Sequence, residues 1–329
     1  MFTSSLPRVH VVGANIYGYT TSILLLLQGY KVTLLANEFP GDTGYHTDDT
    51  TWSWQADASS QHYDTASFKM FWHLAKRKAA ESGMMVGNSF KYYEEPTDDQ
   101  ANPSWNHLVP GFKMIDQQEL PKDVRLGYHY TTVMINTKRY LAWLQTQFLA
   151  MGGRQRRAGQ ATAPLVVNCD GSSTLRPTHQ QQQQWTVRAN QVRRSIHVKT
   201  KHGEELYLNP RLDGTVVFGI NRPIHQYKAH DLLERISTYC PELTWGKGLN
   251  GLTVEELDLT SSIGLDDPRV ENQYIATSLG TKRAVTHNYG HRGHSSSWGA
   301  AQCAVRLVNE AHGHLKKNSQ SVSELLSNL

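Results

Sequence analysis

The sequence predicts an α/β fold, in two domains or in one large unit. A short buried strand, an apolar helix and a second strand follow one another within residues 8–36, which is the order of a β-α-β unit. The chain has 329 residues, more than one hydrophobic core usually spans. Its residues are 39% apolar and 19% charged, and the longest apolar run, Ile23–Leu27, is too short to cross a bilayer. We therefore expect a globular protein that does not span a membrane.

The opening β-α-β unit is the clearest part of the pattern. Arg8–Gly13 alternates into a short strand that ends in a glycine-bounded turn. Ile16–Leu27 is an apolar helical run, and Gly29 follows it where a helix C-cap favours glycine. Lys31–Leu35 then predicts a second strand parallel to the first, because such a connection returns the chain to the same sheet.

Helices and strands continue to the end of the chain. Residues 37–62 predict a long polar loop, residues 83–135 predict short strands and loops, and we expect another loop at the glutamine run Gln180–Gln184. The spacing of apolar residues predicts helices over Thr65–Ser82, Thr137–Met151, Leu232–Tyr239 and Ser297–Leu315, a buried strand over Leu165–Asn168, a meander of Ile196–Lys199, Glu205–Leu208 and Thr215–Gly219, and a strand over Val285–Tyr289.

Charge and cysteine content exclude several classes of protein. The net charge is +4 with basic residues spread along the chain, and their one cluster, Arg154–Arg157, predicts no more than a solvated loop, so nucleic acid is not indicated. Three scattered cysteines make neither a disulfide framework nor a metal-ligand spacing. Met1–Pro7 lacks the features of a secretory signal, and we expect a reducing, intracellular compartment. No metal site is predicted.

Five segments of the chain form recognisable motifs. They are VHVVGANIYGYTTSILLLLQGYKVTLLA (9–36), KRYLAWL (138–144), VVNCDG (166–171), YLNPRLDGTVVFG (207–219) and THNYGHRG (286–293). The last of them and the tract Pro210-Arg211-Leu212-Asp213-Gly214 are specific when they occur together in this order. Together the five segments resemble the D-amino acid oxidase family, with D-aspartate oxidase as a close relative. The resemblance implies a Rossmann-like domain that binds FAD, a second mixed-sheet substrate domain, and hydride transfer from a D-amino acid to the flavin.

The same resemblance implies two domains that are interleaved in sequence. Residues 1–58, 136–180 and 284–329 would form the dinucleotide (FAD-type) domain. Residues 59–135 and 181–283 would form the substrate-type domain. Function still has to be argued from the site, because one fold can carry many activities.

The phosphate turn is the first flavin position to depart from the family. The fingerprint G-x-G-x-x-G gives a tight turn, a close backbone approach to the pyrophosphate, and close helix–strand packing. Gly13, Ala14 and Gly18 match it, but Asn15 takes the place of the middle glycine. A side chain there intrudes on a pyrophosphate at the helix N-terminus. A working phosphate site and a β-α-β unit kept only as scaffold both stay open.

The ribose and flavin-ring positions depart as well. Asn37 stands where the resemblance implies a ribose-binding aspartate, with Glu38 beside it as an alternative. Trp52, Trp54 and Gln55 stand where the loop against the flavin ring has small residues in the family. The two tryptophans either fill the vacated flavin space or line a new pocket.

Three further segments change the surroundings of the cofactor. The segment 152–164 is shorter than the family's strand pair that contacts the adenine. Asp170 places a negative charge beside Gly171, where the phosphates would pass. In the last signature, Arg292 replaces a glycine between Gly290 and Gly293.

The residue expected to bind the substrate carboxylate is negatively charged in this chain, whereas it is positively charged in the family. Tyr207 matches the family's carboxylate-binding tyrosine, but Glu256 stands at the place of the carboxylate-binding arginine. A like-charge contact of this kind is unfavourable by roughly 4 kcal/mol at 4 Å and a dielectric of 20. Asp170, at the carboxyl end of a strand, and His291 are the other candidates for catalysis. We expect these four residues and the two loop tryptophans to border one cavity between the domains.

These departures predict a protein that has lost FAD-dependent oxidative deamination and holds no FAD at high affinity. It would be repurposed as a non-redox small-molecule enzyme or a ligand-binding pseudoenzyme. The alternative is an active FAD-dependent oxidase that acts on an atypical amine or amino acid, with Glu256 attracting the cationic group. A third class is a partner-binding protein that forms a heterodimer with an active paralogue.

The expected partners are a small-molecule ligand and a second protein subunit, in a homodimer or in that heterodimer. The chain ends in Ser327-Asn328-Leu329, one substitution from the peroxisomal address S-K-L. Since asparagine lacks the basic charge of that address, both cytoplasm and peroxisome stay open.

Overall fold

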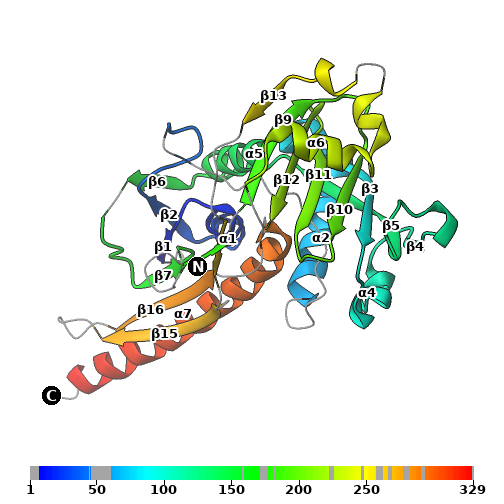
Figure 1. Ribbon diagram of the computed structural model, residues 1–329. Helices are drawn as coiled ribbons and strands as arrows, with labels where there is room; N and C mark the ends of the chain where they lie inside the picture. Colours follow the sequence, from blue (N-terminus) through cyan, green and yellow to red (C-terminus); the bar gives the residue numbers. More distant parts are fainter. Residues whose placement is uncertain are drawn as a thin grey trace.

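The computed structural model describes residues 7–43, 45, 61–157, 159–170, 177–180, 182–221, 226–245, 248–256, 262–265, 269–276, 282–289 and 293–327. Within these residues the chain forms a six-stranded, an eight-stranded and a two-stranded sheet. Figure 1 shows the six-stranded sheet beside the long C-terminal helix and the eight-stranded sheet at the other end of the molecule. The predicted α/β class, with two large sheets, is confirmed.

The six-stranded sheet is built on the opening β-α-β unit. Its order is β15-β16-β7-β1-β2-β6, and all neighbouring strands pair in parallel except β15 and β16, which are antiparallel. The strands are β1 (Arg8–Val12), β2 (Lys31–Ala36), β6 (Arg154–Arg157), β7 (Leu165–Asn168), β15 (Arg269–Ala276) and β16 (Lys282–Tyr289). Helices α1 (Ile16–Leu27) and α7 (Ser297–Ser327) pack against this sheet, and α5 (Thr137–Ala150) packs against α1. The expectation that Val9–Val12, Lys31–Leu35 and Val166–Asn168 share one sheet is confirmed.

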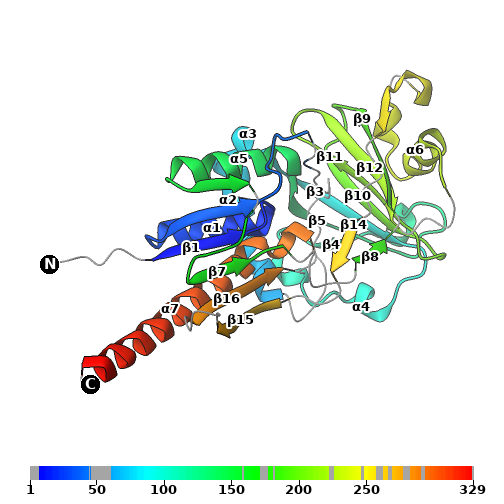
Figure 2. The ribbon, with the colours of Figure 1, turned by 90° about the vertical axis from the view of Figure 1, so that its left-hand side faces the viewer.

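The eight-stranded sheet is mixed and has the order β13-β9-β12-β11-β10-β3-β5-β4. Its strands are β3 (Met84–Tyr93), β4 (Lys113–Met114), β5 (Leu126–Ile135), β9 (Gln182–Arg188), β10 (Arg194–Lys199), β11 (Glu205–Pro210), β12 (Thr215–Asn221) and β13 (Val254–Glu256). Helix α6 (Ala229–Ser237) covers the face that is turned away from the six-stranded sheet (Figure 2). An apolar cluster fills the space between α6 and this face, with Leu232, Leu233 and Ile236 on the helix side.

The remaining elements lie outside the two large sheets. They are α2 (Gln61–Arg77), α3 (Ala79–Ser82), α4 (Asp98–Ala101), the two-stranded sheet of β8 (Pro177–Gln180) and β14 (Ser262–Leu265), and short 3-10 turns at Asn106–Leu108, Gln117–Glu119, Pro241–Thr244, Leu249–Gly251 and Gly293–Ser296. No helix within the described ranges is both long and apolar enough to span a bilayer.

Two stretches of the first half differ from the sequence prediction. The helix expected over Thr65–Ser82 begins at Gln61 and breaks at Lys78, and Gly83 ends its last turn at φ +68°. The short strands expected in 83–135 include two ten-residue strands, β3 and β5, which pair along their whole length. The local sequence pattern did not indicate their length, because the two strands that pair with each other are separated by a long connection in the chain.

Two polar runs expected in loops lie in strands instead. Arg154–Arg157 forms β6, parallel to β2 at the sheet edge, where charged side chains keep their contact with water. Gln180–Gln184 ends β8 and begins β9. Two of these glutamines are buried because they have partners: Gln183 exchanges two hydrogen bonds with the backbone of Tyr227, and Gln184 accepts one from Tyr207.

Strand β15 bears on the expected domain boundaries. Residues 181–283 were assigned to the substrate-type domain, but Arg269–Ala276 is hydrogen-bonded to β16 in the six-stranded sheet. This strand therefore pairs within the sheet that also holds β1, β2 and β7. The division into domains stays a prediction.

Candidate functional site

The phosphate turn lies where β1, α1 and the end of β7 meet. Gly13 has φ +104°, which favours glycine, and a Cβ added to it would lie 3.1 Å from the backbone nitrogen of Asp170. A Cβ added to Gly18 would lie 1.8 Å from the carbonyl oxygen of Gly13. Both glycines are therefore required for the close packing of the turn, whether or not a ligand binds there.

The Asn15 side chain bridges the turn. It is the N-cap of α1: its Oδ1 accepts a hydrogen bond from the Gly18 backbone N–H at 3.0 Å. Its Nδ2 donates to the carbonyl oxygen of Cys169 at 2.8 Å, just beyond β7. One amide of the first helical turn, which a dinucleotide fold can aim at phosphate, is thus bonded to a side chain of the same helix.

Tyr45 also contacts this turn. Its hydroxyl donates to the carbonyl oxygen of Ala14 at 2.6 Å, and burial raises the pKa of that hydroxyl. Ala14 and Ile16 are buried at 6% and 4% exposure. The turn is therefore covered by the chain itself on the side where Tyr45 lies.

Arg157 at the end of β6 binds the residues that follow β2. Asn37 and Glu38 are exposed, and the Asn37 carbonyl accepts a hydrogen bond from Nη1 of Arg157 at 3.0 Å. Nη2 of Arg157 lies 2.7 Å from Oδ1 of Asp42, and this hydrogen bond lowers the pKa of the Asp42 carboxyl. The residues after β2 thus contact the Arg157 guanidinium through the Asn37 carbonyl and the Asp42 carboxylate.

The N-terminus of α7 is joined to α2. Ser296, just before α7, donates its hydroxyl to Oδ1 of Asp64, which is buried at 2% exposure. The Gly299 backbone N–H donates to Oγ of Ser67 at 3.0 Å. A carboxylate at a helix N-terminus is favoured by the helix dipole. The first turn of α7 thus has two partners on α2.

Tyr207 lies in the other sheet, on the β11 face opposite α6. It is 6% exposed, and its hydroxyl donates to Oε1 of Gln184 at 3.0 Å. The side chain passes over Gly219 of the intervening strand, where an added Cβ would lie 2.4 Å from the Tyr207 hydroxyl. This glycine permits the tyrosine to cross the sheet.

The described ranges cover only some of the expected site residues. Asp170 is half-buried against Gly13, and its backbone N–H donates to Oδ1 of Asn168 at 3.0 Å. Glu256 pairs through its backbone with Trp185 on the edge strand β13, and its side chain lies outside the described atoms. Gly293 begins the 3-10 turn before α7. The expected residues outside the described ranges are Trp52, Trp54, Gln55, Gly171, Gly290, His291 and Arg292.

The structure therefore brings Gly13, Asn15, Gly18 and Asp170 together at the carboxyl ends of β1 and β7. Tyr207 belongs to the other sheet, and Asn37 and Glu38 lie at the end of β2. The cavity expected between the domains stays a prediction, because four of its six expected members, Trp52, Trp54, His291 and the Glu256 side chain, are not described.

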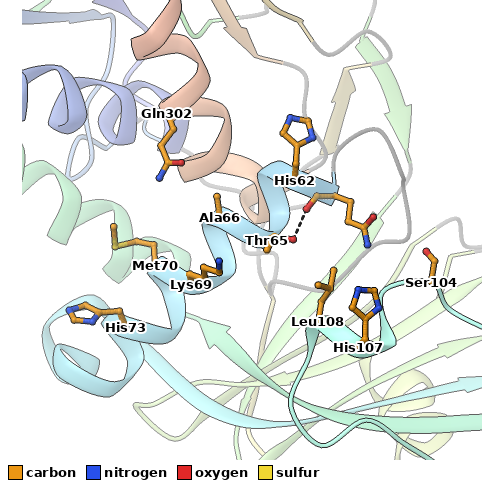
Figure 3. Close-up of a pocket in the computed structure, with 11 residues that line it drawn as sticks. His62, Thr65, Ala66, Lys69, Met70, His73, Ser104, His107, Leu108 and Gln302 are labelled. Atoms are coloured by element: carbon orange, nitrogen blue, oxygen red, sulfur yellow. Dashed lines mark hydrogen bonds between the residues drawn. The ribbon is translucent and has the colours of Figure 1, made fainter.

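An open groove of about 1030 Å³ lies along the outer side of α2 (Figure 3). Its walls come from α2, from residues 104–108 and from Gln302 on α7. The lining includes three histidines and one lysine, namely His62, His73, His107 and Lys69. Among the residues described, no cluster of His, Cys, Asp and Glu side chains could hold a metal ion.

One comparison decides the family of the chain. The family described as FAD dependent oxidoreductase matches residues 8–307, which is most of the chain. The chain belongs to this family. The resemblance to the D-amino acid oxidases inferred from the motifs is confirmed.

Individual relatives of this FAD-dependent oxidoreductase family member align nearly end to end. It is 24% identical to a D-amino-acid oxidase of Dictyostelium discoideum, over 97% of each chain. It is 24% identical to a D-aspartate oxidase of Talaromyces thermophilus, over 92% of this chain and 95% of that one. Its fold is similar to that of glycine oxidase from Geobacillus kaustophilus, with a TM-score of 0.62 at 14% identity over 92% and 95% of the two chains.

Sequence reasoning missed three residues of this oxidoreductase-family site: Tyr45, Asp64 and Arg157. Each acts on a group far away in sequence, with Asp64 bonded to Ser296 and Arg157 to Asp42. The role of Asp64 could have been suspected from the sequence, because a carboxylate near the start of an amphipathic helix can also stabilise the N-terminus of a second helix. The tyrosine and the arginine lay in segments that we expected to be loops.

Proposed function

We propose that this protein is an oxidase-derived small-molecule binder that no longer holds FAD tightly. It acts as a non-redox enzyme or as a ligand-binding pseudoenzyme. The observation that carries the proposal is the Asn15 side chain, which caps α1 at Gly18 and bonds to Cys169. A side chain occupies the place at which the fingerprint requires the bare backbone of a glycine.

The residues present fit FAD poorly at three places. At the pyrophosphate, Asn15 and Tyr45 bond to the turn, and Asp170 adds a carboxylate beside Gly13. At the ribose, Asn37 has no carboxylate to offer and leaves that contact to the exposed Glu38 beside it. At the N-terminus of α7, the Asp64 carboxylate is bonded to Ser296. Each lost hydrogen bond would weaken binding by about 1–3 kcal/mol, so several together remove powers of ten in affinity.

An active FAD-dependent oxidase of an atypical amine or amino acid is the second candidate. The family match and the end-to-end alignment with D-amino-acid oxidases favour it. When bound, FAD would accept the hydride from the substrate. Glu256 would then attract an amine in place of repelling a carboxylate.

The test is a visible absorption spectrum of the purified protein after expression with added riboflavin, followed by titration with FAD. We expect a colourless protein with no tight FAD binding. Asn15→Gly restores the fingerprint, and we expect it to bind FAD about tenfold more tightly than the wild type. A stoichiometric flavin band in the wild type, or peroxide formed from an amine, would instead establish the oxidase.

The partner and the compartment stay predictions. Measuring the size of the protein alone and mixed with an active paralogue separates a homodimer from a heterodimer. Imaging of a fusion that leaves Ser327-Asn328-Leu329 free separates cytoplasm from peroxisome.

A further inference from the structure

The groove along α2 shares no lining residue with the turn at the carboxyl ends of β1 and β7. Its walls come from α2, from the segment 104–108 and from Gln302 of α7, and it measures about 1030 Å³ (Figure 3). No flavin or substrate position expected from the sequence is among the described residues that line it. Since small molecules are usually held in enclosed pockets of roughly 300–1000 Å³, an open groove of this size is better suited to a segment of another chain.

The polar side chains that line the groove can all donate a hydrogen bond. Those that carry or can gain a positive charge are Lys69, His62, His73 and His107, and no carboxylate is among the described lining residues. Lys69, His73 and His107 are exposed, and none of the three is in an ion pair within the described part of the chain. A group of donors without a carboxylate among them favours an anionic partner.

Three apolar side chains lie among these donors. Ala66, Met70 and Leu108 line the groove and are half-buried, and Met70 and Leu108 pack against the buried apolar cluster that includes Phe71. A small inorganic anion would leave the exposed parts of these side chains in contact with water. An occupant with both acidic and apolar side chains would cover them, and methionine adapts easily to different apolar partners.

The spacing of the donors along α2 indicates the shape of that occupant. His62, Lys69 and His73 are seven and four residues apart, which places them along one side of a helix, and Figure 3 shows them in succession along α2. With a rise of about 1.5 Å per residue, they span about 16 Å of the helix axis. A helix that lies alongside α2 can present acidic side chains at the same intervals, with apolar ones between them.

We propose that the α2 groove is a docking site for an acidic amphipathic helix of a partner protein. The carboxylates of that helix accept charge-assisted hydrogen bonds from Lys69 and the histidines, and its apolar side chains cover Met70 and Leu108. The acidic character of the partner follows from charge complementarity, and the apolar side chains favour a protein over a nucleic acid. The docking site is independent of the proposed loss of FAD, because it shares no lining residue with the turn around Asn15.

The test is fluorescence anisotropy of a labelled peptide titrated with the full-length protein at low salt. The peptide is a helix of about five turns made of Glu, Leu and Ala. Its Glu residues follow the spacing of His62, Lys69 and His73, with Leu between them. One matched probe has Gln for every Glu, and a second has the same composition with its Glu residues spread around the helix. We expect the first peptide to bind with a Kd of about 10–100 μM and both matched probes to bind at least about tenfold more weakly.

Two variants locate the binding on the protein. Lys69→Gln removes one positive charge from the groove and should weaken binding of the acidic peptide by about threefold or more. The double variant with His73→Gln removes a second side chain that can carry positive charge, and it should weaken binding by about tenfold. Lys31→Gln is the matched control and should leave binding unchanged, since Lys31 is exposed and does not line the groove. All three side chains are exposed, so each variant should unfold in urea at the midpoint of the wild type.

Each contrary outcome removes one part of the proposal. Equal binding by the wild type and the double variant would show that the peptide binds elsewhere, and would overturn the groove as the site. Equal binding of the acidic peptide and either matched probe would overturn the one-sided acidic helix as the occupant. Tighter binding of a single-stranded oligonucleotide than of the acidic peptide, lost in the double variant, would assign the groove to nucleic acid instead. No detectable binding of the peptide up to about 1 mM would overturn the docking site as a whole.

Discussion

Asn15 acts as a structural residue of α1, and its contribution can be measured. Replacement by alanine removes the acceptor for Gly18 N–H and the donor to the Cys169 carbonyl. We expect Asn15→Ala to lower the free energy of unfolding by about 1–2 kcal/mol in a urea titration. Asn15→Ser keeps a capping oxygen and should lose less. If both variants were as stable as the wild type, the cap would contribute nothing.

His197 predicts a specific loss of stability in acid. Its pKa is about 3 in the folded protein and 6.5 in the unfolded chain, so the unfolded state binds the extra proton below 6.5. Stability should therefore fall as the pH drops from 6.5 towards 3, by about 3 kcal/mol at a pH of about 4.5. His197→Gln should remove this component. Urea titrations at both pH values measure it, with the exposed His202→Asn as control.

At the scale of single residues, the sequence predicts which residues are unusual for the site better than it predicts which atoms they contact. Asn15 could be recognised as a departure from the dinucleotide-binding fingerprint, because the motif itself defines which positions require glycine. That Asn15 reaches Cys169, and that Tyr45 reaches Ala14, could not be read from the motif. Those contacts depend on how a strand and a loop are placed by the rest of the fold.

At the scale of elements, α6 is attached to the eight-stranded sheet by an ion pair as well as by its apolar side. Nη1 of Arg235 lies 2.9 Å from Oε2 of Glu204, a side chain that is only 1% exposed. The Tyr227 hydroxyl donates to the other carboxylate oxygen at 2.7 Å. Glu204 is therefore a buried charge that Arg235 helps to neutralise.

Arg235→Gln should lower the free energy of unfolding by about 3 kcal/mol, because it leaves the Glu204 carboxylate buried without its cation. The double variant with Glu204→Gln removes that charge and should recover at least half of the loss. Arg306→Gln, in an exposed pair with Glu310, is the control and should show no measurable change. Equal stability of single and double variants would contradict the buried-charge explanation.

Element prediction succeeded where the pattern is local and failed where partners are distant. Ile16–Leu27 was predicted to the residue, because its apolar spacing and its glycine cap lie within the segment itself. Arg154–Arg157 was expected to be a loop, because nothing in four polar residues indicates that β2 will pair with them. The Gln155 side chain donates to the Tyr19 hydroxyl on α1 at 2.7 Å, a contact that no local pattern contains.

At the scale of the whole molecule, α2 connects the two sheets. It belongs to a segment that we assigned to the substrate-type domain, yet Asp64 and Ser67 bond to the start of α7. We therefore expect one cooperative unfolding transition, with far-ultraviolet circular dichroism and tryptophan fluorescence coinciding in urea. Ser67→Ala should shift both signals together by about 1 kcal/mol. Two separate transitions would show that the domains unfold independently.

The Asn15 cap also bears on how the protein fares inside a cell. When the amides at a helix N-terminus are bonded only by the phosphate of a cofactor, the apoprotein is less stable than the holoprotein. Cellular quality control can degrade such an apoprotein when the cofactor is scarce. Here the chain supplies the partner of the Gly18 amide from its own sequence. On the proposed function, in which FAD is not held tightly, the abundance of the protein should stay level when the riboflavin supply falls.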